Sequence, residues 1–283
     1  MIIKECLKKG IEALDIIGIE DSVLKAKLLL ANIIEKPKEY LFIHENEELE
    51  DEEEKEFWRQ IDELSKNTPL QYLTKTQEFM GLDFYVNENV LIPRSDTEIL
   101  VEEVLKNIDK SKKVRILDMC TGSGIIGISL AKICDNVEVV CVDKSDKALE
   151  VAFENAKFHG VANRIDFICS DMFGDLYDLC DRRNMKFDII VSNPPYIETE
   201  TIKTLNKDVQ KEPLMALDGG EDGLDFYRII ADKAWNFLNE NGKVFVEIGY
   251  NQGESVIALF KEKFNNVSCV KDLAGLDRVV IAR

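Results

Sequence analysis

The first 70 or so residues repeat apolar side chains at the spacing of α-helices. In the first repeat, Ile3, Leu7, Ile11 and Leu14 fall on one face of the predicted helix. Similar repeats follow, and they occupy residues 22–33, 37–43 and 57–64. No catalytic constellation is visible in these segments, so the pattern predicts a small helical bundle used for recognition or stability.

Between residues 69 and 93 the pattern becomes typical of β-strands. β-Branched and aromatic residues alternate around Gly81 and around residues 87–89, which predicts a hairpin that joins two domains. A helix then opens at Pro93-Arg94. We therefore expect three parts: a helical domain at 1–72, a hairpin linker at 73–93 and a second domain at 94–283.

From about residue 114, strand-like and helix-like segments alternate. This alternation predicts an α/β fold, in which a Rossmann-like parallel sheet has helices on both faces. The predicted strands are 114–119, 137–142, 165–169, 187–192, 243–249, 267–270 and 277–282. The predicted helices are 124–134, 146–159, 222–239 and 252–264. The last two of the seven strands follow each other closely, which predicts an antiparallel addition at one edge.

The charge balance argues against one class of partner. The 283 residues include 54 acidic and 36 basic ones, which gives a formal net charge of −18. General affinity for phosphate backbones rests on clustered Lys and Arg. We therefore expect no direct nucleic-acid binding, although the total charge does not exclude a small basic groove.

The cysteines and the chain start bear on the cellular compartment. Seven cysteines occur, an odd number without a CxxC pair, and several lie in apolar strand-like runs. This indicates a reducing cytoplasm rather than a disulfide framework or a zinc site, and we expect no metal. The first residues do not form a signal peptide, and no apolar run is long enough to span a membrane. We expect a cytoplasmic monomer without a membrane segment.

Proline ends the fourth predicted strand, 187–192, at the motif Asn193-Pro194-Pro195-Tyr196 (the 193–196 motif). Proline donates no backbone hydrogen bond, so a rigid loop must begin here, at the carboxyl end of a strand, where open α/β sheets bind ligands. The Asn193 side-chain oxygen and the Pro194 carbonyl offer two acceptors to an NH2 group, and the Tyr196 ring offers a flat surface. The motif predicts chemistry on a planar amino or amide nitrogen. Asn-Pro alone would favour a plain strand-ending turn.

Three other strand ends indicate an adenosine cofactor. The first strand leads into Cys120-Thr121-Gly122-Ser123-Gly124, where glycine lets the backbone approach a ligand at a helix amino end. Asp143 ends the second strand and is placed to accept hydrogen bonds from ribose hydroxyls, with a helix cap as the alternative. Asp171 ends the third strand and is placed to accept an adenine NH2 while Met172 packs on the ring. A plain surface aspartate is the alternative there.

Two kinds of adenosine cofactor fit these strand ends. Gly122, Gly124 and Gly127 formally match the GxGxxG pattern of dinucleotide-binding folds. The fourth strand separates the two kinds, because a dehydrogenase needs no Asn-Pro-Pro-Tyr, whereas methyl transfer to an NH2 group does. The sequence therefore predicts S-adenosylmethionine.

The combination of motifs resembles the release-factor glutamine methyltransferase family, over about residues 69–283 with a compatible helical front. Asn-Pro-Pro-Tyr alone is shared with enzymes that methylate amino groups of DNA and RNA, but the other matching blocks are more specific. The matching blocks are Pro69-Leu70-Gln71-Tyr72-Leu73, Glu78-Phe79, Gly81-Leu82, Leu91-Ile92-Pro93-Arg94, Thr97-Glu98, Thr121-Gly122-Ser123-Gly124, Asn193-Pro194-Pro195-Tyr196-Ile197, Glu212-Pro213, Ala216-Leu217, Gly219-Gly220, Asp222-Gly223-Leu224, Glu247-Ile248-Gly249, Gln252, Asp272-Leu273-Ala274-Gly275 and Asp277-Arg278.

The resemblance implies a class I methyltransferase sheet, S-adenosylmethionine as cofactor and S-adenosylhomocysteine as product. The implied substrate is the Gln of the Gly-Gly-Gln loop of peptide chain release factors, which is methylated on N5 in support of translation termination. It implies that the 120–124 loop wraps the methionine part, that Asp143 holds the ribose, and that Asp171 and Met172 border the adenine. Asn193 would contact both cofactor and substrate, and the whole 193–196 motif would hold the substrate amide.

Cys120 departs from the family, which usually has glycine there. A positive φ would cost a side chain about 1 kcal/mol or more, so we expect Cys120 to adopt an extended conformation. Further implied features are a loop at 212–224 beside the site, and Arg94 and Glu98 either at its entrance or in a salt bridge. One rival class is a nucleic-acid adenine methyltransferase, which needs a basic target-recognition region. The other is an inactive adenosine-binding scaffold.

Overall fold

The computed structural model describes residues 1–177, 180 and 185–283. The chain divides into two compact units. The first, the helical unit, combines Met1–Thr76 with Asn206–Lys211. The second, the sheet unit, combines Gln77–Leu205 with Glu212–Arg283.

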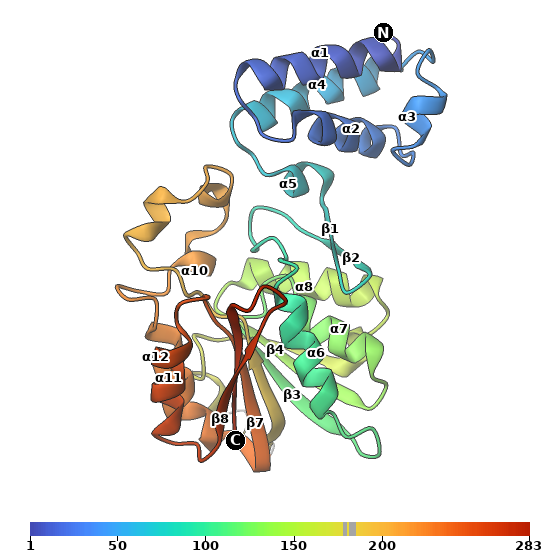
Figure 1. The fold of residues 1–283 in the computed structure, drawn as a ribbon. Coiled ribbons are helices and arrows are strands. Elements are labelled where there is room, and N and C mark those ends of the chain that lie inside the picture. The colour runs from blue at the N-terminus through green and yellow to red at the C-terminus, as the bar shows by residue number, and fades with distance from the viewer. Residues whose placement is uncertain (178–179, 181–184) are drawn as a thin grey trace. The chain divides into compact units, whose positions relative to one another are not determined.

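The helical unit is built from helices, drawn in blue in Figure 1, around one apolar core. Its helices are α1 (Ile3–Ile16), α2 (Ser22–Ile33), α3 (Tyr40–Ile43), α4 (Asp51–Ser65) and α5 (Leu70–Thr74). Gly10 lets α1 and α4 pack closely, because a Cβ there would lie 2.6 Å from the Phe57 ring. The predicted front helices are confirmed.

A short hairpin, β1 (Thr76–Phe79) and β2 (Leu82–Tyr85), is also confirmed. Met80 and Gly81 form its two-residue turn, and both have positive φ as a tight hairpin turn requires. In the sheet unit, Asn155 of α8 (Asp146–Phe158) exchanges hydrogen bonds of 2.7 and 3.0 Å with the Tyr85 backbone. These bonds fasten β2 to α8 within the sheet unit.

The seven-stranded sheet has the order β5-β4-β3-β6-β7-β9-β8 (Figure 1). Its strands are β3 (Val114–Met119), β4 (Val137–Asp143), β5 (Ile165–Cys169), β6 (Phe187–Ser192), β7 (Leu238–Glu247), β8 (Val267–Lys271) and β9 (Asp277–Ala282). Strands β3 to β7 pair in parallel, whereas β9 pairs antiparallel with β7 and β8. The predicted sheet and its antiparallel edge are confirmed.

The predicted helix at 222–239 is wrong at its ends. Helix α11 (Asp225–Lys233) is shorter, and a 3-10 turn (Ala234–Asn236) follows it. Leu238 already pairs with Phe187, so β7 begins five residues before the predicted strand. The register then shifts to Ile189 opposite Lys243, because a polar bulge interrupts the pairing.

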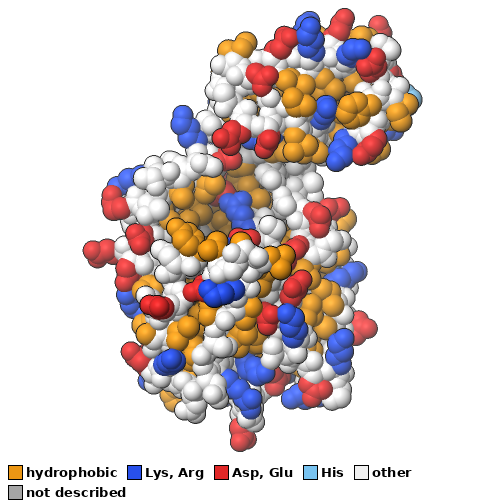
Figure 2. All heavy atoms as spheres, viewed as in Figure 1, with side chains coloured by type: hydrophobic (Ala, Val, Ile, Leu, Met, Phe, Trp, Pro, Cys, Tyr) orange, Lys and Arg blue, Asp and Glu red, His pale blue; other side chains and the backbone are white. Residues whose placement is uncertain are grey.

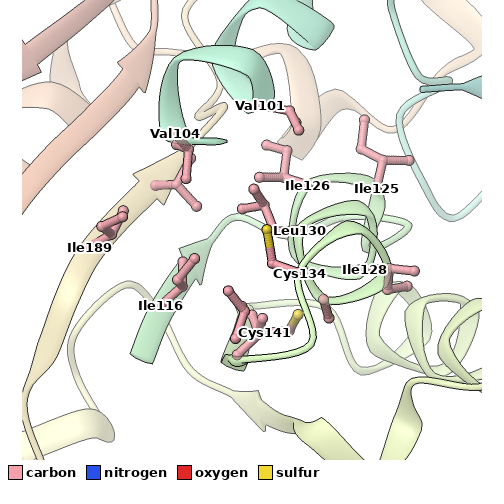
Figure 3. Packing of buried hydrophobic residues seen from close by; sticks show 14 of the residues in the cluster. Val101, Val104, Ile116, Ile125, Ile126, Ile128, Leu130, Cys134, Cys141 and Ile189 are labelled. Carbon is pink, nitrogen blue, oxygen red and sulfur yellow. The ribbon is translucent and has the colours of Figure 1, made fainter. Parts of the chain in front are cut away.

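Helices cover both faces of the sheet and bury its central strands. Alternating residues of β3 divide between two cores: Ile116 packs with α6 (Thr97–Asn107) and α7 (Ile125–Ile133), whereas Leu117 packs with α11 and α12 (Gly253–Lys261). Figure 3 shows the first core, where side chains from α6 and α7 converge on Ile116 and Ile189. Burial on both faces explains the near-continuous apolar strands.

Acidic and basic side chains are interspersed over the face drawn in Figure 2. Within the described part of the chain, no helix combines the length and apolarity needed to cross a bilayer. The same residues contain no group of three or more His, Cys, Asp and Glu arranged to hold a metal ion.

Candidate active site

A cavity of about 510 Å³ lies where the parallel strands end. It belongs to the sheet unit, and ligands bind at this edge in open α/β folds. Seven predicted site residues line it: Cys120, Gly122, Asp143, Asp171, Met172, Asn193 and Pro195. The other predicted residues, Thr121, Ser123, Gly124, Pro194 and Tyr196, are not part of the lining. A separate cavity of about 400 Å³, at the opposite end of the strands, contains none of them.

The 120–124 loop turns sharply after β3. Cys120 has a φ of 59°, so the expected extended conformation is wrong. The turn is set by a 3.0 Å hydrogen bond from the Thr121 amide to the Val142 carbonyl, which draws the chain back toward β4. The Cys120 sulfur lies 3.7 Å from the Met172 sulfur, a contact that offsets part of the left-handed strain.

Gly122 and Gly127 serve different purposes in this segment. A Cβ on Gly122 would meet no atom within 4 Å, so the backbone there borders open space. A Cβ on Gly127 would lie 2.9 Å from the Cys141 sulfur and 3.0 Å from Asp118. Gly127 therefore allows α7 to pack closely on the sheet, and the formal GxGxxG match does not itself indicate a dinucleotide.

Asp118, near the end of β3, is hydrogen-bonded to the loop. It was not among the predicted site residues. Its Oδ2 accepts the Thr121 hydroxyl at 2.6 Å and the Gly127 amide at 3.0 Å. Its Oδ1 has no hydrogen-bond partner among the described residues. Complete burial raises the pKa of Asp118 to about 7. This carboxyl ties the loop to the start of α7.

Asp143 is a half-buried carboxylate that lines the cavity. It accepts the Gly122 amide and the Ser145 amide, each at 2.9 Å, and burial raises its pKa. The helix cap of α8 is Ser145, whose Oγ accepts the Ala148 amide at 3.2 Å. The alternative reading of Asp143 as the cap is therefore wrong.

Asp171 and Met172 border the cavity at the end of β5. Asp171 is exposed and forms a 2.7 Å ion pair with Lys144. Met172 is buried and has a positive φ of 53°. Asp171 thus forms a solvated, polar part of the cavity wall, and Met172 forms an apolar part.

The 193–196 motif presents its polar groups in defined directions. The Asn193 Nδ2 donates to the Thr97 Oγ1 at 3.1 Å. Among the described residues, nothing donates to the Asn193 side-chain oxygen or to the Pro194 carbonyl. The Tyr196 hydroxyl donates to Glu247 at 3.4 Å. Two acceptors are therefore left for a ligand.

A clamp of hydrogen bonds and one close backbone contact holds this motif. Gln252 donates to the Tyr196 carbonyl at 3.0 Å and to the Gly223 carbonyl at 3.2 Å. Ile197 accepts the Gly219 amide at 2.8 Å. A Cβ on Gly219 would lie 2.7 Å from the Tyr196 Cα, so only glycine permits this approach. The 212–224 loop thus lies beside the motif, as the resemblance implied.

Arg94 and Glu98 have structural partners. Arg94 pairs with the buried carboxylate of Glu212, which also accepts the Ile92 amide at 2.9 Å. Glu98 accepts the Met80 amide in the hairpin turn at 2.6 Å. Of the two readings left open for Arg94 and Glu98, these contacts favour the salt bridge for Arg94.

Comparisons with known proteins agree with this architecture. Residues 95–220 match the Methyltransferase small domain, and residues 5–74 match the PrmC N-terminal domain. A methyltransferase structure from Pyrococcus furiosus superposes with a TM-score of 0.51 at 18% identity, covering 79% of this chain and 96% of that one. The hMettl16 catalytic domain superposes with a TM-score of 0.56 at 16% identity, covering 75% and 79%. The sheet unit therefore has the fold of class I methyltransferases.

Two bacterial relatives narrow the class. The Release factor glutamine methyltransferase of Clostridium botulinum is 39% identical, over 100% of this chain and 99% of the relative. The protein of the same name from Clostridium acetobutylicum is 40% identical, over 100% and 98%. The chain belongs to the release factor glutamine methyltransferase family, and membership implies S-adenosylmethionine as cofactor.

Proposed function

We propose that this chain transfers a methyl group from S-adenosylmethionine to the side-chain amide nitrogen of the Gln in the Gly-Gly-Gln loop of peptide chain release factors. One observation carries the proposal within the family: the Asn193 oxygen and the Pro194 carbonyl are both without donors among the described residues, and Asn193 lines a cavity of about 510 Å³. We also propose that the protein acts as a monomer in the cytoplasm, with the helical part at 1–72 recognising the substrate and a hairpin at 73–93 linking it to the catalytic part at 94–283.

The cavity residues fit the cofactor. The open backbone at Gly122 would accept the methionine part within the 120–124 loop. The half-buried Asp143 carboxylate would accept the ribose hydroxyls, and Asp171 and Met172 would border the adenine. When bound, the cofactor supplies an electrophilic methyl group on a sulfonium.

The protein's own contribution is to orient a poor nucleophile. An amide nitrogen shares its lone pair with its carbonyl, so positioning matters more than general-base chemistry. The Asn193 oxygen and the Pro194 carbonyl would accept the two amide hydrogens and stabilise the positive charge that grows on nitrogen. Once the new nitrogen–methyl bond has formed, the nitrogen would release one of its two protons to solvent. Tyr196 would pack along the Gln side chain, and neither His44 nor His159 is needed.

A transfer assay tests this function. We expect the protein, incubated with radiolabelled S-adenosylmethionine, to label a release factor but not the same factor with Gly-Gly-Ala in the loop. Duplex DNA and RNA serve as competing acceptors. Labelling of nucleic acid instead of the release factor would establish the rival adenine chemistry, and labelling of neither would support the inactive scaffold.

A further inference from the structure

Glu247 is a buried acid at the end of β7, behind the 193–196 motif. It is 1% exposed and does not line the cavity. One oxygen, Oε1, accepts the Tyr196 hydroxyl at 3.4 Å, and the other has no hydrogen-bond partner among the described residues. Burial raises the pKa of Glu247 to about 7, and the nearby Thr97 hydroxyl acts in the opposite direction. The carboxyl thus faces two residues that adjoin the proposed acceptor site.

Thr97, the first residue of α6, contacts Asn193 and lies close enough to Glu247 to act on its carboxyl. It is fully buried, and its Oγ1 accepts the Asn193 Nδ2 at 3.1 Å. A hydroxyl has a single proton, and an ionised carboxylate can only accept. If the Thr97 proton is directed to Glu247, the Thr97 oxygen can only accept from Asn193. The amide nitrogen must then face Thr97, and the side-chain oxygen must face away.

We propose that Thr97 and Glu247 are positioning residues, which hold the Asn193 carboxamide so that its oxygen is presented to the substrate amide. This inference rests on the function proposed above. Without the Thr97 hydroxyl, the two orientations of the Asn193 carboxamide become closer in energy. In the reversed one, an NH2 group would face the substrate NH2, and neither can accept from the other.

The surroundings separate this role from a purely structural one. The backbone carbonyl of Glu247 accepts the Tyr227 hydroxyl at 2.8 Å, so the strand end is anchored without the carboxylate. The other charged groups that act on Glu247 are Arg278, which also pairs with Asp272 at 3.0 Å, and Asp96. A buried carboxyl is costly unless paired, and such groups concentrate at functional sites.

The test compares Thr97→Val, which keeps the shape and removes the hydroxyl, with Thr97→Ser, which keeps the hydroxyl. We expect Thr97→Val to lower kcat on a release factor by at least about 30-fold with the affinity for S-adenosylmethionine within about threefold. Thr97→Ser should restore most of that loss. The matched control is Thr204→Val at an exposed position outside the cavity lining, with kcat unchanged. A fully active Thr97→Val enzyme overturns the proposal.

A double-mutant cycle and a spectrum sharpen the test. If Thr97 acts through Asn193, Thr97→Val should cost nothing further in an Asn193→Ala background, whereas additive losses contradict the relay. In 15N spectra, the Asn193 side-chain NH2 should exchange slowly with solvent in the wild type and quickly in Thr97→Val. This readout requires no activity, so it still decides the orientation if release factors prove not to be the substrate. Fast exchange already in the wild type overturns the proposal.

If Thr97→Val does not fold, Glu247→Gln and Glu247→Leu provide the second comparison. Gln keeps an oxygen that can accept from Thr97, whereas Leu does not. We therefore expect Glu247→Gln to retain more activity than Glu247→Leu and to keep the slow exchange of the Asn193 amide. Equal kcat in both variants, with the wild-type exchange rate, would contradict the relay.

Discussion

Asn193 is the side chain whose loss should separate catalysis from cofactor binding. Asn193 lines the cavity, but most of the proposed cofactor contacts come from other residues. We expect Asn193→Ala to lower kcat by at least about 100-fold while the cofactor affinity stays within about tenfold. Calorimetry and single-turnover assays would measure the two quantities. An active Asn193→Ala enzyme would contradict the proposed role.

Cys120 tests how much strain the cofactor loop tolerates. At a φ of 59°, a β-branched side chain is worse than cysteine, whereas glycine relieves strain but loses the contact with Met172. We expect Cys120→Val to lower the free energy of unfolding by about 2 kcal/mol and Cys120→Gly to change it by less than about 1 kcal/mol. Urea unfolding gives both values. Wild-type stability in Cys120→Val would show that the loop can relax.

Single residues also mark the limit of sequence reasoning. The strand-end positions of Asp143 and Asn193 follow from local patterns, and the structure brings both to one cavity. The positive φ of Cys120 was missed, because it depends on a hydrogen bond between Thr121 and the distant Val142. Thr97 reaches Asn193 across 96 positions, and no local signal indicates that contact.

At the scale of elements, a titratable side chain, Asp118, stabilises the loop between β3 and α7. The pKa of Asp118 is about 7 in the folded protein against an ordinary 3.8, so the folded state binds the proton more tightly. The stabilisation from this group is present below pH 4 and is lost as the pH rises to 7. Asp118→Asn removes that titration. As the pH rises from 4 to 7, the free energy of unfolding of Asp118→Asn should increase relative to that of the wild type by up to about 1.4 kcal/mol per pH unit.

Urea unfolding of both proteins between pH 4 and 8 measures this difference. Absolute stability includes many other carboxyls, so the informative quantity is the difference between variant and wild type at each pH. A difference that does not vary with pH would mean that Asp118 titrates normally.

The clamp on the 193–196 motif depends on the close approach of Gly219 to the Tyr196 backbone. Alanine at Gly219 would bring a Cβ within 2.7 Å of the Tyr196 backbone, which cannot move aside as a flexible side chain would. We expect Gly219→Ala to destabilise the protein by about 1–3 kcal/mol and to reduce kcat. The control is Gly275→Ala, where the added Cβ meets open space and only the positive φ is strained. Equal activity in both variants would contradict the clamp.

The sequence pattern predicts the boundaries of some elements better than those of others. The strands buried on both faces, such as Val114–Met119 and Phe187–Ser192, were predicted to the residue because apolar runs and proline delimit them. The helix after Gly223 was predicted too long, because helical spacing continues into Leu238. Pairing of Leu238 with Phe187 overrides that local preference, and such pairing is invisible in a single sequence.

At the scale of the whole molecule, the surface charge separates the two acceptor classes. The formal net charge is −18, and basic side chains alternate with acidic ones on the face in Figure 2. Nucleic-acid affinity at physiological salt comes mainly from neutralised phosphates. We expect fluorescence anisotropy with a labelled duplex, and with single-stranded RNA, to give dissociation constants weaker than about 100 µM at 150 mM salt. Lowering the salt should strengthen binding little, because few counterions are released. A micromolar dissociation constant that rises steeply with salt concentration would reveal a basic groove and would support adenine methylation instead.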